Sequence, residues 1–442
     1  MEIKELSRII RDNGVVGAGG AGFPTYIKID ERANTIIMNC AECEPLLNLH
    51  RQLLQRYAKE ILETFSLIAD TVGAKEAIIG IKAEYKQAIE ALHDYIELYP
   101  NVSIHLLKSV YPAGDEVILI YETTGIVIPP GEIPIESGIA VFNVETVYNI
   151  YRGYQNGEPV VDKVVSIVGE VENPITVRVP LGCSIEDVVS TAGKLTTEHP
   201  MYMIGGPMMG KIGSRYDTIT KTTNAILVLP ENHFIVQRKR GKASIELKRA
   251  ASACCQCQMC TDLCPRHALG HPIEPHKFMR SAANKDFRDT NVFIHTLFCS
   301  SCGLCEMYAC PQGLSPRTLM EAYKIGLRKA FVKVPKGVRT ATIKESREYR
   351  KTPKDRLTAR LGLSKYEKPS PFYDNVVSVS IVKELLCQHI GTSARAIVKI
   401  GDMVYRGQVI GRETEGLCVP LHASISGRVT DVTERYIMIK AD

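Results

Sequence analysis

The middle of the chain carries two cysteine-rich stretches, Cys254-x-x-Cys257-x-x-Cys260-x-x-x-Cys264-Pro265 and Cys299-x-x-Cys302-x-x-Cys305-x-x-x-x-Cys310-Pro311. The first has the spacing with which small proteins hold 4Fe–4S clusters, and the second has one extra residue before its last cysteine. In such stretches three thiolates hold one cluster and the fourth holds the neighbouring cluster. The predicted metal ligands are therefore Cys254, Cys257, Cys260 and Cys310 for the first cluster, and Cys299, Cys302, Cys305 and Cys264 for the second. Clusters that exchange ligands lie close together, so we expect the chain to move single electrons.

Other uses of cysteine fit this pattern less well. Structural zinc sites use two C-x-x-C pairs, whereas neither stretch stops at two cysteines and each ends in Cys-Pro. A disulfide framework fits less well still. Cys255 lies inside the first stretch and is an alternative ligand to Cys254 or Cys257. The regular spacing favours Cys254 and Cys257, which leaves Cys255 as a packing residue or a sulfur beside the cluster.

Length and composition limit the function further. The chain has 442 residues, which suggests about three domains. It has no apolar run approaching the roughly 18 residues of a membrane span. The opening Met1-Glu2-Ile3-Lys4-Glu5 is not typical of a secretory signal. Together with the predicted iron–sulfur clusters, these features favour a cytoplasmic protein with no direct membrane span.

The formal net charge of +5 comes largely from two basic segments, residues 238–242 and 324–360. Such segments are usually solvated faces or linkers, and docking of an acidic electron-transfer partner is the alternative. No nucleic-acid recognition motif accompanies the charge, so we expect no nucleic acid as a partner.

Helix and strand patterns divide the chain into modules. Residues 1–155 alternate between the two periods, with helices expected at 53–72, 85–99 and 116–124 and strands at 35–38, 77–81 and 102–107. This alternation favours an α/β domain with a largely parallel sheet. Beyond it we expect a small α+β module at 160–232, a helical cysteine region at 243–326, a basic linker at 327–375 and an all-β module at 376–442.

A glycine-rich loop, Gly17-Ala18-Gly19-Gly20-Ala21-Gly22-Phe23-Pro24, is the second chemical signal. Such a loop exposes backbone N–H groups and lets a phosphate approach closely. Alone, the pattern is equally compatible with an ordinary flexible turn. It gains weight from Lys28, which is positioned to neutralise a phosphate, and from three polar motifs further along the chain.

Those motifs are Asn39-x-x-Glu42-x-Glu44-Pro45, Gly114-Asp115-Glu116 and Asn143-Val144-Glu145-Thr146. With the glycine loop they resemble the flavin- and NADH-binding subunit of respiratory complex I, and still more the C subunit of the Rnf electron-transport complex. The resemblance implies that FMN is held by Gly17, Gly19, Gly20, Lys28, Asn39, Asp115 and Asn143. It also implies that Phe23, Glu44 and Glu116 contact NADH. The chain departs from complex I at Ala41, where complex I carries an acidic residue.

Two further modules resemble parts of the same proteins. Residues 162–229 are similar to the soluble-ligand-binding β-grasp (SLBB) module, and 376–442 to a barrel-sandwich hybrid of the biotinyl/lipoyl type. Arg412 and Glu413 stand where a carrier lysine is expected, so we predict docking or packing rather than a swinging arm. The fold class is therefore multidomain α/β. Its parts are an FMN-binding α/β domain, an SLBB-like β-grasp module, a ferredoxin-like domain with two clusters and a C-terminal barrel-sandwich hybrid.

The order of the modules resembles the PduS family, the cobalamin reductases of propanediol-utilisation microcompartments. This resemblance implies an oxidoreductase with FMN, two 4Fe–4S clusters and NADH, which reduces oxidised corrinoid to reactivate a dehydratase. It places the chain in the cytoplasm, within a bacterial microcompartment. Its partners would be NADH, cobalamin or a corrinoid-handling enzyme, and a shell protein. We assign no general acid or base.

Two other functions remain open. One is that of an Rnf-type protein equivalent to the C subunit, which passes electrons between NADH and ferredoxin or quinone-linked partners. The other is a non-enzymatic electron carrier or scaffold with a vestigial flavin loop. Histidines 267, 271 and 276 lie between the cysteine motifs and include candidates for cobalt ligation, although packing or helix capping is the commoner role. The amphipathic opening helix at Ile3–Ile10 is predicted to pack locally, with shell targeting as the alternative.

Overall fold

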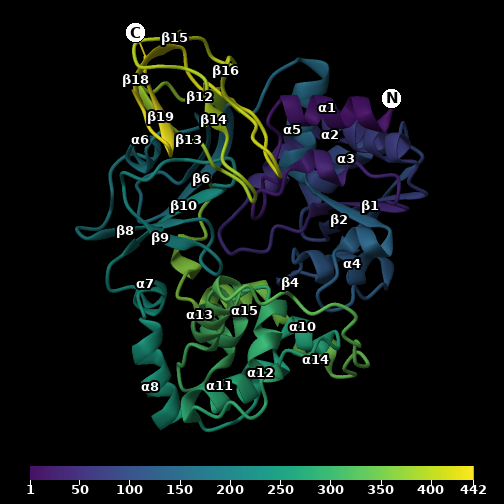
Figure 1. The fold of residues 1–442 in the computed structure, drawn as a ribbon, viewed down its shortest axis with the longest axis vertical. Helices are drawn as coiled ribbons and strands as arrows, with labels where there is room; N and C mark the ends of the chain where they lie inside the picture. Colours follow the sequence, from purple (N-terminus) through teal and green to yellow (C-terminus); the bar gives the residue numbers. More distant parts are fainter. Residues whose placement is uncertain (442) are drawn as a thin grey trace.

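A parallel sheet of four strands forms the centre of the N-terminal module. The computed structural model describes residues 1–441. The strands lie in the order β3-β2-β1-β5, and every neighbouring pair is parallel, as predicted. They span Thr35–Cys40 (β1), Glu76–Lys82 (β2), Val102–Leu107 (β3) and Ile139–Asn143 (β5). The N-terminal module lies at the upper right of Figure 1.

Helices cover both faces of this sheet because successive strand residues point to opposite sides. Ile36 and Met38 of β1 pack against α1 (Ile3–Asp12), α2 (Leu49–Val72), α3 (Lys86–Ile96) and α5 (Val144–Gln155), whereas Ile37 packs against α4 (Glu116–Thr124). Leu6 and Ile10 place the apolar side of α1 in the first of these cores. This confirms the predicted local packing of the opening helix.

The next module along the chain shares a core with the C-terminal one. A six-stranded sheet, ordered β12-β7-β6-β10-β8-β9, forms the SLBB-like module. Its strands are β6 (Asp162–Gly169), β7 (Ile175–Pro180), β8 (Pro200–Ile204), β9 (Lys211–Gly213), β10 (Ala225–Pro230) and β12 (Phe372–Val376), with helix α6 (Ile185–Ser190). Ile167 and Val179 of this sheet pack in one cluster with Val382 and Ile439 of the C-terminal module. The C-terminal module is therefore fixed to its neighbour.

The C-terminal module consists of two antiparallel sheets, ordered β13-β19-β18-β15 and β14-β16-β17. The strands are β13 (Ile381–Leu385), β14 (Arg395–Ala396), β15 (Met403–Val404), β16 (Val409–Arg412), β17 (Leu421–His422), β18 (Gly427–Val432) and β19 (Tyr436–Lys440). They are drawn in yellow at the upper left of Figure 1.

Short helices build the cysteine module at the bottom of Figure 1. They are α7 (Phe234–Lys239), α8 (Ala243–Ala253), α9 (Met259–Asp262), α10 (Pro265–Ala268), α11 (Pro275–Asn284), α12 (Asn291–Ile294) and α13 (Pro316–Lys329). Phe278, Phe293 and Tyr323 pack ring against ring in its core. None of the helices within residues 1–441 has the length and apolar character to cross a membrane.

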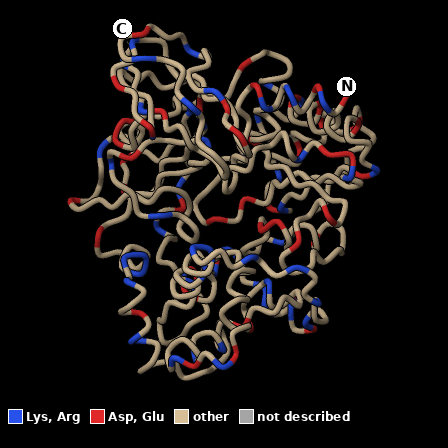
Figure 2. Tube along the Cα trace, viewed as in Figure 1, with Lys and Arg blue, Asp and Glu red and all other residues tan. Residues whose placement is uncertain are grey.

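The segment expected to be a basic linker is folded. It contains α14 (Arg347–Arg350), β11 (Thr352–Pro353), which pairs with β4 (Val110–Tyr111), and α15 (Lys354–Arg360). It ends in β12, which joins the SLBB-like sheet beside β7. Its charge has a structural use, because Lys351 lies 2.9 Å from Glu122 of α4 and Arg347 pairs with the same carboxylate. Figure 2 shows acidic and basic positions interspersed over all modules.

One buried carboxylate joins three modules. Asp162 at the start of β6 is 1% exposed and accepts from Arg152 of α5 at 2.7 Å, Arg178 of β7 at 3.0 Å and Arg406 of the C-terminal module at 2.6 Å. Burial alone would raise the pKa of Asp162, but Arg152 and Arg178 outweigh it and lower that pKa to about 2. The contribution of Asp162 to stability is therefore present above the ordinary pKa of an aspartate and is lost as the pH falls through about 2.

We expect Asp162→Asn to lower the stability of the protein by about 3 kcal/mol, because it leaves buried guanidinium groups without their shared carboxylate. The matched control is Glu158→Gln, which removes a half-exposed partner of Arg152 and should cost less than about 1 kcal/mol. Chemical denaturation at neutral pH measures both. Equal losses in the two variants would contradict the role given to Asp162.

Candidate flavin and iron–sulfur sites

The structure gathers the eight motif cysteines around two cavities. One is lined by Cys254, Cys257, Cys260 and Cys310. The other is lined by Cys264, Cys299, Cys302 and Cys305. These are the two predicted sets, including the exchange of the fourth cysteine between motifs. Cys255 also lines the first cavity and is exposed, so its place beside the cluster or as an alternative ligand stays a prediction.

The loops that carry these cysteines are bent toward the cavities. Gln256 and Gln258 in the first loop and Ser301 in the second have φ of 55°, 65° and 60°, which non-glycine residues rarely adopt. Such strain is typical of loops held in shape by a functional site. The amide of Ser301 lies 3.3 Å from the Cys299 sulfur and donates to it, which stabilises a thiolate.

These surroundings fit clusters of several metal atoms. Among residues 1–441, no three His, Cys, Asp or Glu side chains converge closely enough to hold a single metal ion. Instead, four motif cysteines line each cavity, which is the number of thiolates that a 4Fe–4S cluster takes. Burial raises the pKa of the Cys260 and Cys264 thiols to about 12, so iron binding to these sulfurs has to release protons.

The extra residue of the second motif is absorbed by a change of helix type. Residues Cys305–Ala309 form a π-helical turn, which contains one residue more per turn than an α-helix. The corresponding turn of the first motif, Met259–Asp262, is α-helical. The insertion therefore leaves Cys310 able to reach the first cavity.

The glycine-rich loop closes on itself and presents its tip to solvent. The Gly17 amide donates to the Phe23 carbonyl at 2.9 Å, and the Ala18 amide donates to the Thr146 hydroxyl at 2.9 Å. A side chain on Gly19 would lie 2.4 Å from Asn143 Nδ2, so only glycine fits there. A side chain on Gly20 would meet open space, which leaves the tip accessible to a ligand.

The other predicted flavin residues gather at the carboxyl edge of the parallel sheet, where open α/β sheets bind ligands. Asn39 and Asn143 are neighbours across β1 and β5. The Asn39 amide donates to the Gly114 carbonyl at 2.9 Å, and Asp115 caps the first turn of α4. Lys28 Nζ donates to the Val141 carbonyl at 2.7 Å. This donor set fits FMN, with amides and an ammonium for its phosphate.

Three contacts at this edge were not predicted. Thr146 holds the glycine loop, although it belongs to the motif that contains Asn143. His50 lies 3.0 Å from Asn143 Nδ2, and a lone histidine at a helix start carries no sequence signal. Arg266 lies 2.9 Å from Asp115 and is the second residue after Cys264. Only proximity to Cys264 could have drawn attention to Arg266.

Glu44 contacts the SLBB-like module. Its carboxylate accepts from the backbone amides of Met208 and Met209, both at 2.8 Å. A side chain on Gly206 would lie 2.3 Å from the same carboxylate, so the Gly-Gly-Pro-Met-Met-Gly loop needs glycine there. Burial raises the pKa of Glu44. The contact of Glu44 with NADH stays a prediction.

The second cavity lies against the flavin module. The Arg266–Asp115 ion pair joins the residue after Cys264-Pro265 to helix α4, and the Tyr111 hydroxyl donates to the Cys302 carbonyl at 2.6 Å. The first cavity opens to the surface, because Cys257 is exposed. The two cysteine-lined cavities therefore lie between the flavin edge of the sheet and the protein surface.

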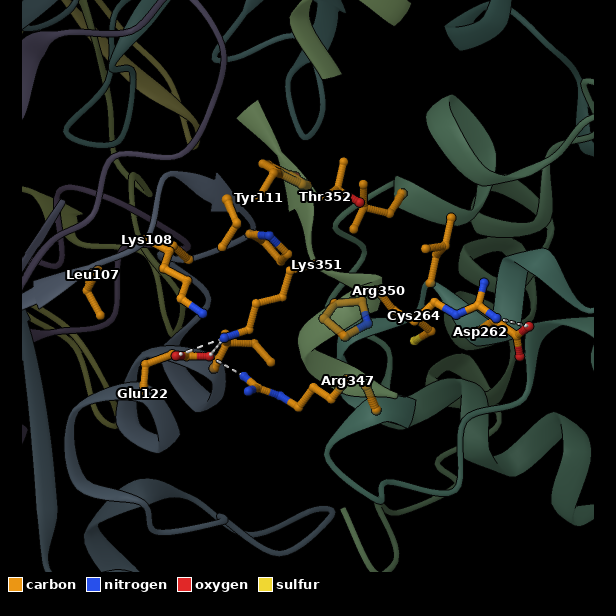
Figure 3. A pocket seen from close by; sticks show the side chains of 18 residues that line it. Leu107, Lys108, Tyr111, Glu122, Asp262, Cys264, Arg347, Arg350, Lys351 and Thr352 are labelled. Atoms are coloured by element: carbon orange, nitrogen blue, oxygen red, sulfur yellow. Dashed lines mark hydrogen bonds and ion pairs between the residues drawn. The ribbon is translucent and has the colours of Figure 1, made fainter. Parts of the chain in front are cut away.

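A third cavity lies between the flavin module, the cysteine module and residues 347–352 of the folded segment that follows the cysteine module. Figure 3 shows Cys264 on one side of it and Lys108, Arg347 and Lys351 on the other. Dashed lines join Glu122 to Arg347 and Lys351, and Asp262 to Arg350, so these three cations are paired. We interpret this region as a contact between modules.

Two of the three central histidines, His271 and His276, make contacts that support packing roles. His271 Nε2 lies 2.9 Å from the Ile128 carbonyl, and burial lowers the pKa of His271 to about 4. His276 Nδ1 lies 2.7 Å from the Thr261 hydroxyl. One ring nitrogen of each is engaged within the protein, which favours packing over the alternative of cobalt ligation for these two residues. The Nδ1 of His267 is buried without a hydrogen-bond partner, so the role of His267 stays a prediction.

The exchanged ligand sets make a direct prediction. We expect Cys310→Ser to damage the cluster held by Cys254, Cys257 and Cys260 and to leave the other intact, so that iron falls from about eight to about four per chain. Cys255→Ser is the matched control and should keep both clusters. Iron analysis and electron paramagnetic resonance of the reduced protein measure this. Loss of the second cluster alone would show that Cys310 serves the other set.

Comparison with known proteins identifies each module. Models of four families match the chain: the Nuo51 FMN-binding domain at residues 10–152, the SLBB domain at 164–211, a 4Fe–4S dicluster domain at 253–315 and the RnfC barrel sandwich hybrid domain at 374–442. They confirm the predicted fold class and show that FMN and 4Fe–4S clusters are the cofactors.

A crystal structure of an NAD⁺-reducing NiFe hydrogenase in the H₂-reduced state has a similar fold, with a TM-score of 0.50 and 21% identity. The likeness covers 76% of this chain and 63% of that one. The C subunit of the ion-translocating oxidoreductase complex of Edwardsiella ictaluri is 32% identical over 266 residues, which is 59% of this chain and 32% of that protein.

Two relatives match from end to end. The cobalamin reductase PduS of Salmonella typhimurium is 38% identical over 438 residues, which cover 98% of this chain and 96% of that protein. The cobalamin reductase PduS of Citrobacter freundii is 38% identical over 432 residues, with 97% and 95% covered. This chain therefore belongs to the PduS family of cobalamin reductases, which are flavin- and iron–sulfur-dependent oxidoreductases.

Proposed function

We propose that this chain oxidises NADH and delivers the electrons one at a time to cobalamin. The observation that carries the proposal is the continuous contact, within one chain, from the flavin edge of the sheet to an exposed cysteine cavity. Asp115 of α4 pairs with Arg266 beside the second cavity, and the first cavity reaches the surface at Cys257. The end-to-end similarity to two cobalamin reductases supports cobalamin as the acceptor.

The chemistry requires a change from two electrons to one. NADH gives up a hydride, which carries an electron pair, whereas the cobalt of a corrinoid is reduced in single steps. A bound FMN supplies this conversion, because a flavin accepts a pair and releases electrons singly. The protein contributes binding and orientation, and no side chain is assigned as a general acid or base.

The flavin edge of the sheet provides the groups that would bind FMN and NADH. In the proposal, the FMN phosphate is held by the amides of Gly19 and Gly20 and the ammonium of Lys28, with Gly17 shaping the loop through its bond to the Phe23 carbonyl. Asn39, Asp115 and Asn143 hold the rest of FMN, and Phe23, Glu44 and Glu116 contact NADH. Lys28 is 27% exposed and lies 3.6 Å from Glu116, so its charge faces the accessible side of the sheet edge.

In the proposal, the two cysteine sets act at different steps of electron transfer. Electrons from the flavin enter at one set, Cys264, Cys299, Cys302 and Cys305. Tyr111 and Asp115 of the flavin module contact the surroundings of this set. Electrons leave the protein at the other set, Cys254, Cys257, Cys260 and Cys310, because Cys257 is exposed. Cobalamin, or the enzyme that handles it, would approach at this second set.

The proposal also covers where in the cell the protein works. The resemblance to the PduS family supports a cytoplasmic enzyme inside a bacterial microcompartment, with a corrinoid-handling enzyme and a shell protein as neighbours. Helix α1 buries Leu6 and Ile10 in the flavin module, so a shell protein could contact only the outer side of this helix or another surface.

Reduction of cobalamin can be compared directly with reduction of ferredoxin. We expect anaerobically purified holoprotein to reduce cobalamin with NADH more than tenfold faster than an equal concentration of free reduced FMN. Removal of FMN should abolish this activity, and added FMN should restore it. No gain over free flavin would contradict the proposal, and a preference for ferredoxin would favour the Rnf-type function.

A cysteine variant separates the two halves of the reaction. We expect Cys302→Ser to keep the bleaching of flavin absorbance by NADH and to lose at least about tenfold in cobalamin reduction, because its cluster lies between flavin and acceptor. The control is Cys255→Ser, which should keep both. Stopped-flow absorbance measures each half. Unchanged cobalamin reduction in Cys302→Ser would contradict the entry of electrons at the set that contains Cys302.

A further inference from the structure

The C-terminal module contacts the back of the glycine-rich loop. Gly22 is buried, has a φ of 74° and lies against the turn formed by Gln388 and His389. A side chain on Gly22 would lie 2.9 Å from His389 Cα and 3.2 Å from the Gln388 carbonyl oxygen. It would also lie 3.0 Å from Thr222 of the SLBB-like module. Three modules therefore meet at one end of this loop.

A buried lysine joins the same three modules. Lys221 of the SLBB-like module is 3% exposed, and its Nζ donates to the Gly14 carbonyl of the flavin module at 2.6 Å. The Lys221 amide donates to Gln388 Oε1 of the C-terminal module at 3.0 Å. A side chain on Gly14 would lie 2.7 Å from the Lys221 Nζ and 3.0 Å from the Pro420 carbonyl. The contact is therefore closely packed.

One buried carboxylate of the C-terminal module, Glu384, acts on the charge of Lys221. Burial lowers the pKa of Lys221 to about 8, and the nearby Glu384 carboxylate opposes that shift. Glu384 is fully buried in the C-terminal module and accepts from the Ser424 amide at 3.0 Å. Its Oε2 and the Nδ1 of His422 are buried without a hydrogen-bond partner. Buried charged and polar groups are costly unless they are paired, so this junction contains groups that simple packing does not require.

The loop itself suggests a use for this junction. Four glycines between residues 17 and 22 make it flexible in isolation, and ordering glycine costs more backbone entropy than ordering any other residue. Its tip, Gly19–Ala21, is exposed, and Gly20 faces open space. Contacts that fix the base of the loop in advance would lower the cost of binding a ligand at the tip.

We infer that Lys221 and the Gln388–His389 turn are positioning residues for the glycine-rich loop, so that the C-terminal module holds residues 14–24 ready for FMN. This rests on the proposed function, in which the loop binds the FMN phosphate. It gives the barrel-sandwich module a role that requires no carrier lysine, consistent with Arg412 and Glu413 at the expected turn.

The first test is Lys221→Met, which removes the ammonium and keeps an apolar chain of similar length. The matched control is Lys194→Met at an exposed position of the same module. Hydrogen exchange in flavin-free protein should become at least about tenfold faster for amides of residues 14–24 in Lys221→Met and stay unchanged in the control. Unchanged exchange in Lys221→Met would overturn the inference, whether or not the loop binds FMN.

The second test measures FMN affinity from the quenching of its fluorescence. We expect Lys221→Met to bind FMN about tenfold more weakly while keeping its iron content and its kcat at saturating FMN. A purely structural role would instead lower the iron content and the unfolding midpoint and leave the FMN affinity of the folded fraction unchanged. That result would overturn the inference.

Gln388→Leu provides a second variant should Lys221→Met fold poorly. It removes the acceptor of the Lys221 amide but keeps the buried charges. We expect faster hydrogen exchange of residues 14–24 and about threefold weaker FMN binding. Wild-type affinity and exchange in Gln388→Leu would count against a role for the C-terminal turn. Failure of wild-type protein to bind FMN would instead refute the proposed function, and the exchange measurement would still test the junction.

Discussion

The structure depends on a buried carboxylate shared between modules. Asp162 accepts from guanidinium groups of the flavin module, the SLBB-like sheet and the C-terminal module, and Arg178 continues the network to Asp374 at 2.7 Å. Hydrophobic contacts tolerate sliding, but an ion pair out of water is favourable only when its partners are in place. The network therefore fixes how the modules are oriented. Separate contacts hold the flavin edge of the sheet against the cysteine cavities, namely Arg266 with Asp115 and Tyr111 with the Cys302 carbonyl.

Much of the fold was predictable because the signals are local. The alternation of helix and strand gave the parallel sheet, and helix α4 has its predicted bounds, Glu116–Thr124. The spacing of the cysteines predicted the two sets that line the cavities, since a fixed number of residues limits where each thiol can reach. The candidate flavin residues were named from a resemblance, and the sheet edge gathers Asn39, Asp115 and Asn143.

The contacts between modules were not predictable. Glu44 accepts amides from residues 208 and 209, and Lys221 donates to Gly14, yet neither pair has a sequence pattern that links its members. The segment 327–375 was expected to be a linker because its charges suggested solvent exposure. Its Arg347 and Lys351 are instead paired with Glu122 across a module boundary. The π-helical turn at Cys305–Ala309 also depends on where Cys310 must reach, which local propensity does not encode.

The central claim is that FMN links NADH to the two clusters. The most direct measurement mixes NADH rapidly with oxidised protein that has both clusters but no FMN, and follows cluster absorbance with and without added FMN. The account predicts negligible cluster reduction without FMN and full reduction once FMN is restored. Equal rates of cluster reduction in both cases would contradict it.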